Sequence, residues 1–506
     1  MMTEARKEVI LVYPEMGFSG ALVRHLPLSS LYAAVDAIKA GYEVKLLDAR
    51  LCPRSWRRAL AAMITDKTLL VGVTVLTGAP IRSALAISRW VKTHYPNVAV
   101  VWGGPHATFN GPETLSEPSV DYVVSGFGAR PLERLCRKLS GDQGAPEFED
   151  IPGLVYRLGA QVRAVPPEPE FEVRDFRDIP YHLVEPDLPK YGQLGTPERI
   201  FPMYSVMGCP YRCAFCSSPA QYRDIAKKNL FIPPEQVAAH IEHVQTRFGA
   251  TYIYFIDDDS FVRLDHVERI IDEIERRGLK VRLGFRGARV NEIMKMSDSY
   301  LDKLAAAGTN ILHIGAESGS QRILDLVHKD CTVDDIIECN VKLARHPGIT
   351  AAYNWVVGLP GETVGDLDRT RSLILRLLED NPKAIMFIPN KYRPLPGTEL
   401  YSDAVAHGYT PPVRLEDWAE VEAESHFAAP WYTREQTAMI HMMQLTSYFV
   451  DRKLWKVETG NSPMFRLLRL AAAVYGPVAR YRFRSGWSGF PLEYMLFRAA
   501  GALLRH

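Results

Sequence analysis

Short apolar runs alternate with longer amphipathic segments over residues 1–140 of the chain. The apolar runs are rich in Val, Ile and Leu and predict the strands Val9–Tyr13, Glu43–Asp48, Leu69–Thr74, Val98–Trp102 and Tyr122–Val124. Apolar residues at helical spacing predict the helices Ser29–Ala40, Trp56–Ile64, Ile81–His94 and Pro131–Leu139. Strands that alternate with helices in this way predict an α/β domain with a doubly wound, Rossmann-like parallel sheet.

The alternation stops in residues 141–200, where nine prolines fall within 60 residues. We interpret this segment as a proline-rich linker with a little irregular strand near Gly153–Arg157. The alternation resumes over residues 201–405, where we expect the strands Met203–Met207, Tyr252–Ile256, Val281–Phe285, Ile311–Gly315, Thr350–Val357 and Ala384–Ile388. The expected helices are Pro234–Thr246, Asp265–Arg277, Asp298–Ala307, Ser320–His328, Val333–Arg345 and Val364–Glu379. Six β/α repeats are too few for the eight-stranded barrel, so we predict a partial (β/α)6 barrel.

Residues 406–506 lack strand patterns, and we expect them to form a helical C-terminal region. The part from Pro463 onward contains seven arginines and one acidic residue, Glu493, among apolar and aromatic residues at roughly helical spacing. This part therefore carries +6, which leaves −5 for residues 1–462 because the whole chain carries +1. Two interpretations stay open: a capping subdomain with a solvated basic face, and an interfacial segment that contacts anionic lipid. Gly486, Gly489 and Pro491 argue against one continuous helix.

The composition excludes several classes of protein. The chain has 506 residues, of which 47% are hydrophobic, as in a globular protein of about three domains. Lys+Arg 60 against Asp+Glu 59 argues against a dedicated nucleic-acid binder. Seven cysteines are too few for a secreted disulfide scaffold. A polar N-terminus and no long charge-free apolar run predict a cytoplasmic protein, whose thiols stay reduced.

Three of the cysteines, Cys209, Cys213 and Cys216, follow the first predicted barrel strand with the spacing C-x3-C-x2-C. Three neighbouring thiolates require a soft metal. Zinc prefers four ligands, and the remaining cysteines are far away in the sequence, so zinc would need a distant His or Cys to complete its site. An iron–sulfur cubane held by three thiolates keeps one iron open for a ligand. The loop also lies at the C-terminal face of the predicted barrel, where barrel enzymes place their chemistry.

This spacing and placement resemble those of the radical S-adenosylmethionine (radical SAM) superfamily. The resemblance implies that Cys209, Cys213 and Cys216 ligate a 4Fe–4S cluster whose open iron chelates the amine and carboxylate of SAM. One electron, from a donor such as flavodoxin or ferredoxin, then cleaves SAM to a 5′-deoxyadenosyl radical that abstracts hydrogen from an unactivated C–H bond.

Three further segments at predicted strand ends resemble motifs of the same superfamily. Residues 315–320 resemble G-x-E-S-G-S, residues 358–363 resemble G-L-P-G-E-T, and residues 254–261 contain a D-D-x-F segment. Arg286 and Arg289 end the third strand and are candidates to pair with the SAM carboxylate or with those acids. The SAM-binding residues implied by the resemblance are Phe215, Asp257, Asp258, Arg286, Glu317, Ser318, Gly358 and Gly361.

Glycine-containing segments also follow the strands of the N-terminal domain, at residues 73–80, 102–106 and 124–128. Glycines there allow the backbone to approach a bulky ligand. The pattern resembles the cobalamin-binding domain of the cobalamin-dependent (class B) radical SAM enzymes. The cobalamin-binding residues implied are Thr74, Leu76, Thr77, Gly78, Gly103, Gly104, His106, Gly126 and Gly128.

The string D-x-H-x-x-G, whose His ligates cobalt in cobalamin mutases, does not occur in this sequence. We therefore expect base-off cobalamin without a protein His on cobalt, with the loop at Leu76 as a candidate for its lower face. By its neighbours, His106 is better interpreted as a hydrogen-bonding loop residue than as a metal ligand. A degenerate domain without a cofactor is the alternative.

The resemblance implies a methyltransferase that acts on an unactivated carbon of a small-molecule or lipid-like substrate. Two alternatives stay open: a radical SAM cyclase of the anaerobic magnesium-protoporphyrin ester cyclase type, and a non-enzymatic zinc-binding module. A methylthiotransferase is disfavoured because only Cys52 and Cys136 precede position 200. The basic, aromatic residues 463–506 favour an amphiphilic substrate and peripheral contact with the inner face of the membrane. Tyr392, Arg393 and Trp355 are candidate cavity residues by their position in the barrel.

Overall fold

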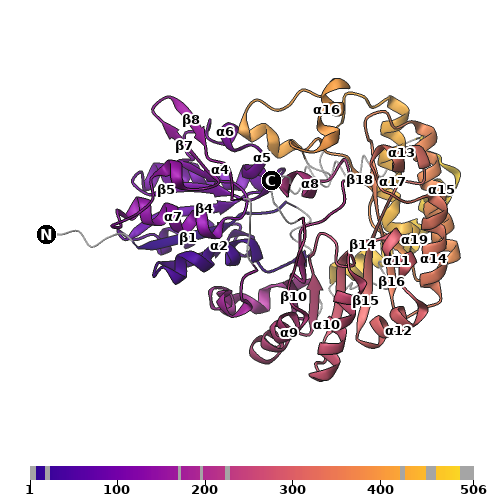
Figure 1. Ribbon diagram of the computed structural model, residues 1–506. Helices are drawn as coiled ribbons and strands as arrows, with labels where there is room; N and C mark the ends of the chain where they lie inside the picture. Colours follow the sequence, from indigo (N-terminus) through magenta and orange to yellow (C-terminus); the bar gives the residue numbers. More distant parts are fainter. Residues whose placement is uncertain are drawn as a thin grey trace.

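The computed structural model describes residues 7–17, 23–168, 173–193, 198–222, 228–421, 428–451 and 463–489 of the protein. An N-terminal α/β domain lies beside a larger α/β barrel, and the C-terminal helices lie on the outer side of the barrel (Figure 1). This arrangement of two α/β units followed by helices is the one that the alternating pattern predicts.

The N-terminal domain is built on a seven-stranded sheet. The strands are β1 (Glu8–Tyr13), β3 (Glu43–Asp48), β4 (Thr68–Thr74), β5 (Ala99–Gly103), β6 (Tyr122–Val124), β7 (Leu154–Leu158) and β8 (Gln161–Ala164), in the order β3-β1-β4-β5-β6-β7-β8. The first five are parallel and match the predicted strands to within one residue. The other two form an antiparallel hairpin that extends the sheet. This hairpin lies in the segment that the proline content had indicated as a linker, so the segment does more than connect two domains.

Helices cover both faces of this sheet, as expected for a doubly wound domain. They are α2 (Leu28–Lys39), α3 (Trp56–Met63), α4 (Pro80–His94) and α7 (Ala129–Ser140). Because successive side chains of a strand point to opposite faces, β1 contributes Ile10 and Val12 to one apolar cluster and Val9 and Leu11 to another. The sheet is therefore buried on both faces. A ligand can approach it at the carboxyl ends of the strands.

The second domain is a six-stranded parallel sheet, which confirms the predicted partial barrel. Its strands, in spatial order, are β10 (Ile200–Met203), β13 (Tyr252–Phe255), β14 (Arg282–Arg289), β15 (Thr309–Glu317), β16 (Thr350–Val357) and β17 (Ile385–Met386). The main outer helices are α9 (Pro234–Phe248), α10 (Leu264–Arg276), α12 (Asp298–Ala306), α14 (Val333–Ala344) and α15 (Val364–Asp380). Three shorter helices are α8 (Ser218–Gln221), α11 (Val290–Lys295) and α13 (Gln321–Leu326).

The first barrel strand lies earlier than the sequence predicted. It covers Ile200–Met203 rather than Met203–Met207, because the chain leaves the barrel at Tyr204. The following residues form the short strand β11 (Val206–Met207), which pairs antiparallel with β12 (Leu230–Phe231). At the other side of the barrel, β18 (Asn390–Lys391) adds a short parallel pairing to β16. The cysteine motif is thus carried on a separate small ribbon above the barrel.

The C-terminal region is helical, with α16 (Glu399–Ala406), η6 (Leu415–Glu420), α17 (Arg434–Val450) and α19 (Pro463–Ser485). The last helix ends directly before Gly486, whose φ of 69° is left-handed, so this glycine interrupts the basic segment as predicted. The expectations for Glu493, Arg498 and Arg505 fall on residues 490–506, outside the described residues. Among the described residues, no helix combines the length and the apolar character needed to cross a membrane.

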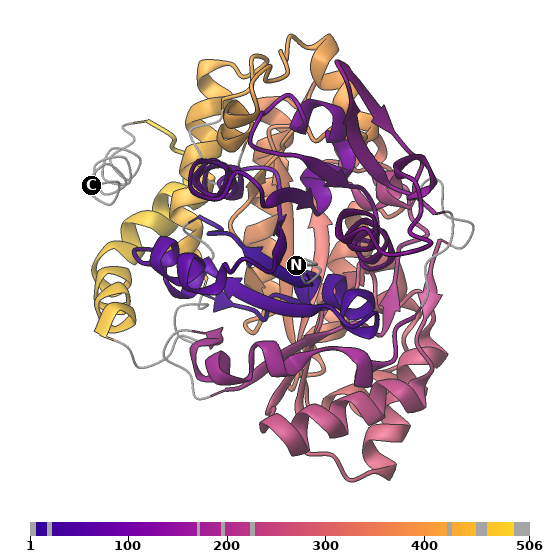
Figure 2. The same cartoon turned by 90° about the vertical axis from the view of Figure 1, so that its left-hand side faces the viewer.

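In Figure 2 the N-terminal domain lies in front of the barrel, and residues that follow its strands contact the barrel. Phe127, after β6, lies 6.1 Å from the ring of Tyr222, and His25 stacks on Tyr254 of β13 with ring centroids 5.4 Å apart. The loop after β5 reaches the barrel as well, because a Cβ at Gly397 would lie 3.0 Å from the ring of Phe109. The loops with candidate functions in the two domains therefore face one another.

Candidate functional site

The cysteine loop begins at a glycine that no other residue can replace without strain. Gly208 has a φ of 90°, and a Cβ there would lie 2.2 Å from the carbonyl oxygen of Lys228. The ribbon β11–β12 closes directly beneath it. This close approach fixes the direction in which the chain enters the motif at Cys209.

The three cysteines of the motif lie on one half-buried turn and form no disulfide. The backbone N–H of Cys216 donates to the carbonyl oxygen of Cys213 at 3.0 Å. Burial raises the pKa of Cys209 and of Cys216, and neighbouring charges, which include the other cysteines of the motif, raise both further. Loading with a metal centre would therefore release protons from these thiols.

The three thiols of the motif are the donors that this turn offers to a metal centre. Zinc draws all its thiolates to one centre at about 2.3 Å, whereas a cubane binds each thiolate at a different iron. The donor set of three thiols on one turn thus fits a 4Fe–4S cluster with one open iron.

A buried arginine connects the barrel to the cysteine loop. Arg289 ends β14 and donates through Nη1 to Sγ of Cys213 at 3.0 Å. Its guanidinium lies 3.8 Å from the centroid of the Tyr211 ring and also donates to the carbonyl oxygen of Lys329. Tyr211 in turn donates to Glu292 at 2.6 Å. Arg289 is therefore placed to hold positive charge beside the metal-binding thiols.

Asp257, expected to contact SAM, instead anchors the start of the cysteine loop. One oxygen accepts from the backbone N–H of Ser205 at 2.8 Å and of Val206 at 3.2 Å. The other accepts from the hydroxyls of Ser205 and Ser260 at 2.6 and 2.8 Å. Burial raises the pKa of this carboxyl to about 6. The neighbouring Asp258 is exposed and accepts from the Ser218 hydroxyl at 2.9 Å, which places it at the edge of the loop.

The G-x-E-S-G-S segment ends β15 and contains a buried ion pair. Glu317 adopts a φ of 62°, unusual for a residue with a side chain, and accepts from Nζ of Lys329 at 2.8 Å. Both side chains are buried, and a Cβ at Gly315 would lie within 2.5 Å of both polar ends. Ser318 does not point to this side, because its hydroxyl bonds to Thr370 on α15. Glu317 therefore belongs to the site, and Ser318 holds the outer helix.

Lys329 is a residue of the site that the sequence pattern did not indicate. It lies between His328 and Asp330, whose φ values of 53° and 56° are also left-handed. The carbonyl oxygen of Val327 accepts from the backbone N–H of Ala214, so this loop packs directly on the cysteine motif. The left-handed conformations of His328 and Asp330, on either side of Lys329, are visible only in the backbone. The sequence carries no local signal for them.

The G-L-P-G-E-T turn after β16 is held from outside by the C-terminal region. The indole N–H of Trp431 donates to the carbonyl oxygen of Gly358 at 3.1 Å, and a Cβ at Gly358 would lie 1.9 Å from the hydroxyl of Tyr432. One carboxylate oxygen of Glu362 accepts from the backbone N–H groups of Gly358 and Leu359, and burial raises the pKa of this group to about 8. Gly361 also has a left-handed φ, 73°.

The remaining predicted SAM-binding residues occupy two different places. Phe215 packs at the edge of an apolar cluster that includes Leu359 and Tyr392, so it lies beside the G-L-P-G-E-T turn. Arg286 lies three positions before Arg289 on β14, and its side chain is exposed rather than bonded to the cysteine loop. Its charge acts on His25 and His313, whose pKa values are lowered by burial first and by nearby arginines second.

In the N-terminal domain, the loops after β4 and β5 are joined to each other. The backbone N–H of Val75 donates to the carbonyl oxygen of Gly103 at 2.8 Å, and that of His106 donates to the carbonyl oxygen of Val75 at 3.0 Å. A Cβ at Gly104, whose φ is 92°, would lie 2.9 Å from Oγ1 of Thr74 and from the Val75 nitrogen. This junction keeps the backbone of both loops at the edge of the sheet.

Most of the predicted cobalamin-binding residues are accessible along this edge. The partly or fully accessible ones are Thr74, Leu76, Thr77, Gly103, Gly104, Gly126 and Gly128, whereas Gly78 and His106 are buried. Leu76 is 40% exposed at the tip of its loop and presents an apolar side chain there. A glycine-rich edge with an exposed apolar tip, facing the barrel, fits a large ligand such as a corrin.

His106 is a structural residue, as its neighbours in the sequence suggested. Its Nδ1 lies 2.9 Å from Oγ1 of Thr77, and its ring packs against Trp418 with centroids 5.7 Å apart. Burial lowers the pKa of His106 to about 4, so the imidazole is neutral at pH 7. With no exposed surface, this side chain does not reach toward the barrel.

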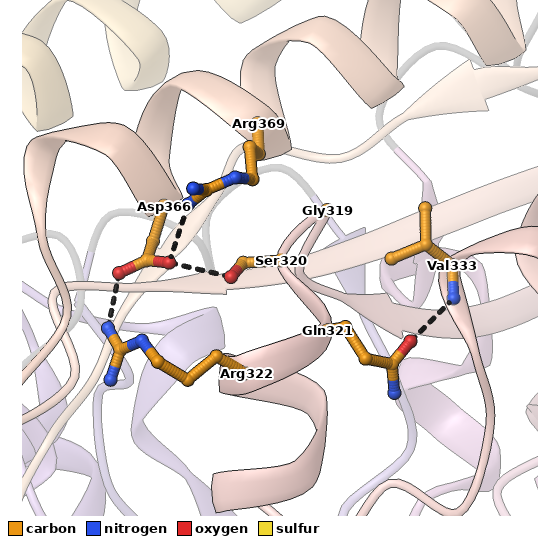
Figure 3. Close-up of a pocket in the computed structure, with 7 residues that line it drawn as sticks. All are labelled: Gly319, Ser320, Gln321, Arg322, Val333, Asp366 and Arg369. Carbon is orange, nitrogen blue, oxygen red and sulfur yellow. Dashed lines mark hydrogen bonds and ion pairs between the residues drawn. The ribbon is translucent and has the colours of Figure 1, made fainter.

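A surface cavity of about 440 Å³ lies at the end of the G-x-E-S-G-S segment, beside Gly319 and Ser320 (Figure 3). It is lined at the start of α13 and α15, where Asp366 accepts from the Ser320 hydroxyl at 2.6 Å and is flanked by Arg322 and Arg369. The carboxylate of Asp366 thus forms ion pairs with both guanidinium groups. The cavity lies on the outer face of the barrel and shares none of the residues of the cysteine loop.

Two protein-family models match the chain in the places that the geometry indicates. Residues 203–374 match the radical SAM superfamily, and residues 21–136 match the B12 binding domain. The first range begins at the end of β10 and includes the cysteine loop. The second includes the three glycine-containing loops of the N-terminal domain.

Several curated proteins are similar over most of the chain. An uncharacterised methyltransferase of Pyrococcus horikoshii is 28% identical over 75% of this chain and 79% of its own length. The anaerobic magnesium-protoporphyrin IX monomethyl ester cyclase of Rubrivivax gelatinosus is 25% identical over 78% of this chain and 69% of its own. The hopanoid C-3 methylase of Methylococcus capsulatus is 22% identical over 91% of this chain and 88% of its own.

Solved structures share the same fold across both domains. The cobalamin-dependent SAM radical enzyme OxsB superposes with a TM-score of 0.71 at 14% identity, covering 94% of this chain and 72% of its own. The radical SAM methyltransferase TsrM of Kitasatospora setae gives 0.66 at 17% identity, covering 98% of this chain and 100% of its own. With the B12-binding loops placed opposite a three-cysteine loop on a partial barrel, the chain belongs to the cobalamin-dependent radical SAM enzymes, whose cofactors are a 4Fe–4S cluster, SAM and cobalamin.

Proposed function

We propose that the protein is a methyltransferase that acts on an unactivated carbon of a small-molecule or lipid-like substrate. The observation that carries this proposal is the opposition of the two loop systems across the domain boundary, with His25 and Phe127 reaching Tyr254 and Tyr222. When bound, the cofactors supply a 5′-deoxyadenosyl radical for hydrogen abstraction and a methyl group from methylcobalamin. An electron donor such as flavodoxin or ferredoxin supplies the electron that SAM cleavage consumes.

The residues of the chain have separate tasks in this proposal. Cys209, Cys213 and Cys216 hold the cluster, and Arg289 holds positive charge beside it. The ion pair of Glu317 with Lys329 lies on the same side and offers polar groups to SAM. The turn around Gly358 and the ring of Phe215 form the apolar side of the pocket, where an adenine would stack.

Cobalamin is proposed to bind base-off, without a protein His on cobalt. The support is the burial of His106, which leaves that side chain with no path to the face of a corrin at the sheet edge. Leu76 offers an apolar surface to the lower face instead. Absorption and EPR spectra of cob(II)alamin on the protein test this: we expect a base-off spectrum without nitrogen superhyperfine splitting that is unchanged in His106→Ala. A histidine-type splitting that disappears in this variant would contradict the proposal.

Anaerobic incubation of reconstituted protein with SAM, reductant and hydroxocobalamin tests the radical chemistry. We expect 5′-deoxyadenosine, S-adenosylhomocysteine and bound corrinoid. Cys213→Ala removes a cluster ligand and should abolish 5′-deoxyadenosine, whereas Cys52→Ala, which alters a half-buried thiol outside the motif, should leave it unchanged. Formation of 5′-deoxyadenosine that survives Cys213→Ala would refute the assignment of the cluster.

A second candidate function is a radical cyclisation, because the Rubrivivax gelatinosus cyclase resembles 78% of this chain. The two functions differ in the mass of the product. Methylation adds one CH₂ to the substrate and consumes a second SAM as methyl donor. Cyclisation adds no carbon and forms no stoichiometric S-adenosylhomocysteine, so mass spectrometry of the product separates them.

Peripheral contact with an anionic membrane is proposed for α19. On this helix Leu470, Val474, Val478 and Tyr481 are exposed by 48 to 75% and follow one another at helical spacing. Arg480 and Arg484 are exposed beside them, and the described part of the segment, residues 463–489, contains no acidic residue. An apolar stripe flanked by cations fits the surface of an anionic bilayer.

Vesicle co-sedimentation tests this contact. Val474→Asp should reduce binding to vesicles with phosphatidylserine and leave the weak binding to phosphatidylcholine vesicles unchanged. Val341→Asp is the matched control, since Val341 is an exposed apolar residue on another helix, α14. If both variants lose vesicle binding equally, or if neither loses it, the support for α19 as the membrane-facing element is removed.

A further inference from the structure

The inner face of the barrel carries a cluster of aromatic and basic side chains. On the barrel strands, one set of side chains points outward: Phe255, Phe285 and Leu312 pack in the apolar core with the outer helices. The residues adjacent to them in sequence are Tyr254, Arg286 and His313. Because side chains alternate along a strand, these three point to the opposite face, into the barrel.

These inward-facing rings form a continuous row. His25, from the N-terminal domain, stacks on Tyr254 with centroids 5.4 Å apart and an angle of 10° between planes. The edge of Tyr254 meets His313 at 5.7 Å, and His313 stacks on Phe387 at 5.1 Å and 11°. All four side chains keep partial exposure although they lie deep in the molecule, so they line an accessible space rather than a closed core.

His25 is held in this place by a buried ion pair. Arg50 donates to its carbonyl oxygen at 2.8 Å and to both oxygens of Asp48, at 2.9 and 2.6 Å. Tyr191, from the segment between the two domains, also donates to Asp48 at 3.0 Å. The imidazole is therefore positioned by the N-terminal domain although it covers a space inside the barrel, and its buried Nδ1 has no hydrogen-bond partner among the described residues.

Arg286 supplies positive charge to this space and is not neutralised. Within the described part of the chain, its guanidinium makes no hydrogen bond or ion pair, in contrast to Arg282 on the same strand, which pairs with Glu198. Burial, followed by nearby arginines, lowers the pKa of both His25 and His313 to about 4, so both imidazoles are neutral at pH 7. An exposed guanidinium that has no carboxylate partner among the described residues is available to bind an anion from outside.

We propose that this space binds the substrate, and that the substrate carries a carboxylate or phosphate on a planar, unsaturated or aromatic body. The guanidinium of Arg286 would bind the anion through two parallel hydrogen bonds. The rings of Tyr254 and Phe387 would cover the planar body. The inference rests on the proposed function only in taking the barrel interior as the substrate site, and an amphiphile of this kind is compatible with a membrane-facing α19.

Binding of fluorinated probes to the reconstituted holoenzyme, measured by ¹⁹F NMR, tests the proposal. The probes are 4-fluorobenzoate, 4-fluorophenyl phosphate and the neutral 4-fluorobenzamide. We expect saturable binding of at least one anionic probe and at least tenfold weaker binding of it to Arg286→Gln. Arg286→Lys keeps the charge without the forked donors and should give an intermediate affinity. Arg282→Gln is the matched control and should bind as the unaltered protein does.

The comparison of the two anionic probes identifies the anion as carboxylate or phosphate. Absence of saturable binding of both, or equal affinity in Arg286→Gln, would overturn the proposal. Complete displacement of the bound probe by saturating SAM would also overturn it, because Arg286 would then serve the SAM carboxylate. The readout needs no turnover, so failure of methylation with probe binding intact would contradict the proposed function and leave this inference standing. Bound iron and the circular dichroism spectrum of each variant show that it is folded and loaded.

Discussion

Arg289 donates a hydrogen bond from Nη1 to Sγ of Cys213 at 3.0 Å, although 76 residues separate them in the sequence. The contact joins the last residue of β14 to the centre of the cysteine loop. The same guanidinium also donates to the carbonyl oxygen of Lys329, the residue that pairs with Glu317. One buried cation thus connects the metal-binding loop to the proposed SAM-binding side of the site.

Replacement of Arg289 by Leu should make reduction of the cluster more difficult. Loss of a cation and of a hydrogen bond at a cysteine sulfur destabilises the reduced, more negative cluster, and we expect the potential to fall by on the order of tens of millivolts. An EPR-monitored redox titration measures this. Arg282→Leu removes an arginine from the exposed start of the same strand and should leave the potential unchanged. A potential that is equal in all three proteins would contradict a role for Arg289 at the cluster.

Asp257→Asn should loosen the cysteine loop even without a cluster. The amide replaces one acceptor oxygen by an NH₂ group, which would face either the backbone N–H groups of Ser205 and Val206 or the hydroxyls of Ser205 and Ser260, all of which now donate to the carboxylate. We expect a loss of about 3 kcal/mol in the free energy of unfolding of the apoprotein, measured in urea. Asp258→Asn alters an exposed neighbour that accepts from the Ser218 hydroxyl and should cost less than about 1 kcal/mol. Similar losses of unfolding free energy in both variants would contradict the idea that the buried hydrogen bonds of Asp257 stabilise the cysteine loop.

Glu362 should make the protein less stable as the pH rises. Burial raises the pKa of its carboxyl from 4.5 to about 8, so between these values the folded chain binds a proton that the unfolded chain has released. The stabilisation is complete below pH 4.5 and is lost as the pH rises through about 8. Urea unfolding from pH 5 to 9 should therefore show a steeper decline for the unaltered protein than for Glu362→Gln, which has no proton to lose. Parallel pH profiles would contradict this account.

Gly104→Ala should abolish cobalamin binding while the barrel keeps its cluster. A Cβ there would lie 2.9 Å from Oγ1 of Thr74 and from the Val75 nitrogen, at a φ of 92° that disfavours any side chain. The loops after β4 and β5 would have to separate. Gly159→Ala is the control, because its φ of 60° is also left-handed but it lies in the turn between β7 and β8, where a Cβ would meet nothing within 4 Å. Titration with hydroxocobalamin gives both affinities, and iron content reports the cluster. Equal corrinoid affinity in the two variants would refute the role of this junction.

The ion pair of Lys329 with Glu317 should show strong coupling between its partners. Lys329→Met leaves a buried carboxylate without its cation and should cost about 3 to 5 kcal/mol of unfolding free energy. Adding Glu317→Gln removes that uncompensated charge, so the double variant should be more stable than Lys329→Met alone. Losses that simply add would mean that the two side chains do not interact in the folded protein.

The predicted elements and the site differ in how far the sequence could specify them. The strand Tyr122–Val124 was located correctly because a buried parallel strand is a continuous apolar run. In the hairpin that follows, β7 matches the strand expected near Gly153–Arg157. The second strand, β8 (Gln161–Ala164), was not predicted, because it is fully exposed and has no buried residue to mark it. At the site, Cys209, Cys213 and Cys216 were identified from spacing alone. Lys329 was not, because its place depends on three left-handed residues that no local pattern encodes.

The sequence by itself determined the two α/β units, the three thiols on one turn and the glycines at the strand ends, since each depends on residues close together in the chain. Only the tertiary structure decided which side chains meet across strands. It placed Arg289 rather than Arg286 at Cys213, directed Asp257 to the backbone of Ser205, and brought His25 from one domain over Tyr254 of the other. Side-chain direction along a strand alternates with every residue, and contacts between distant segments depend on how sheets and helices pack. A linear pattern specifies the elements, but the chemistry between them depends on that packing.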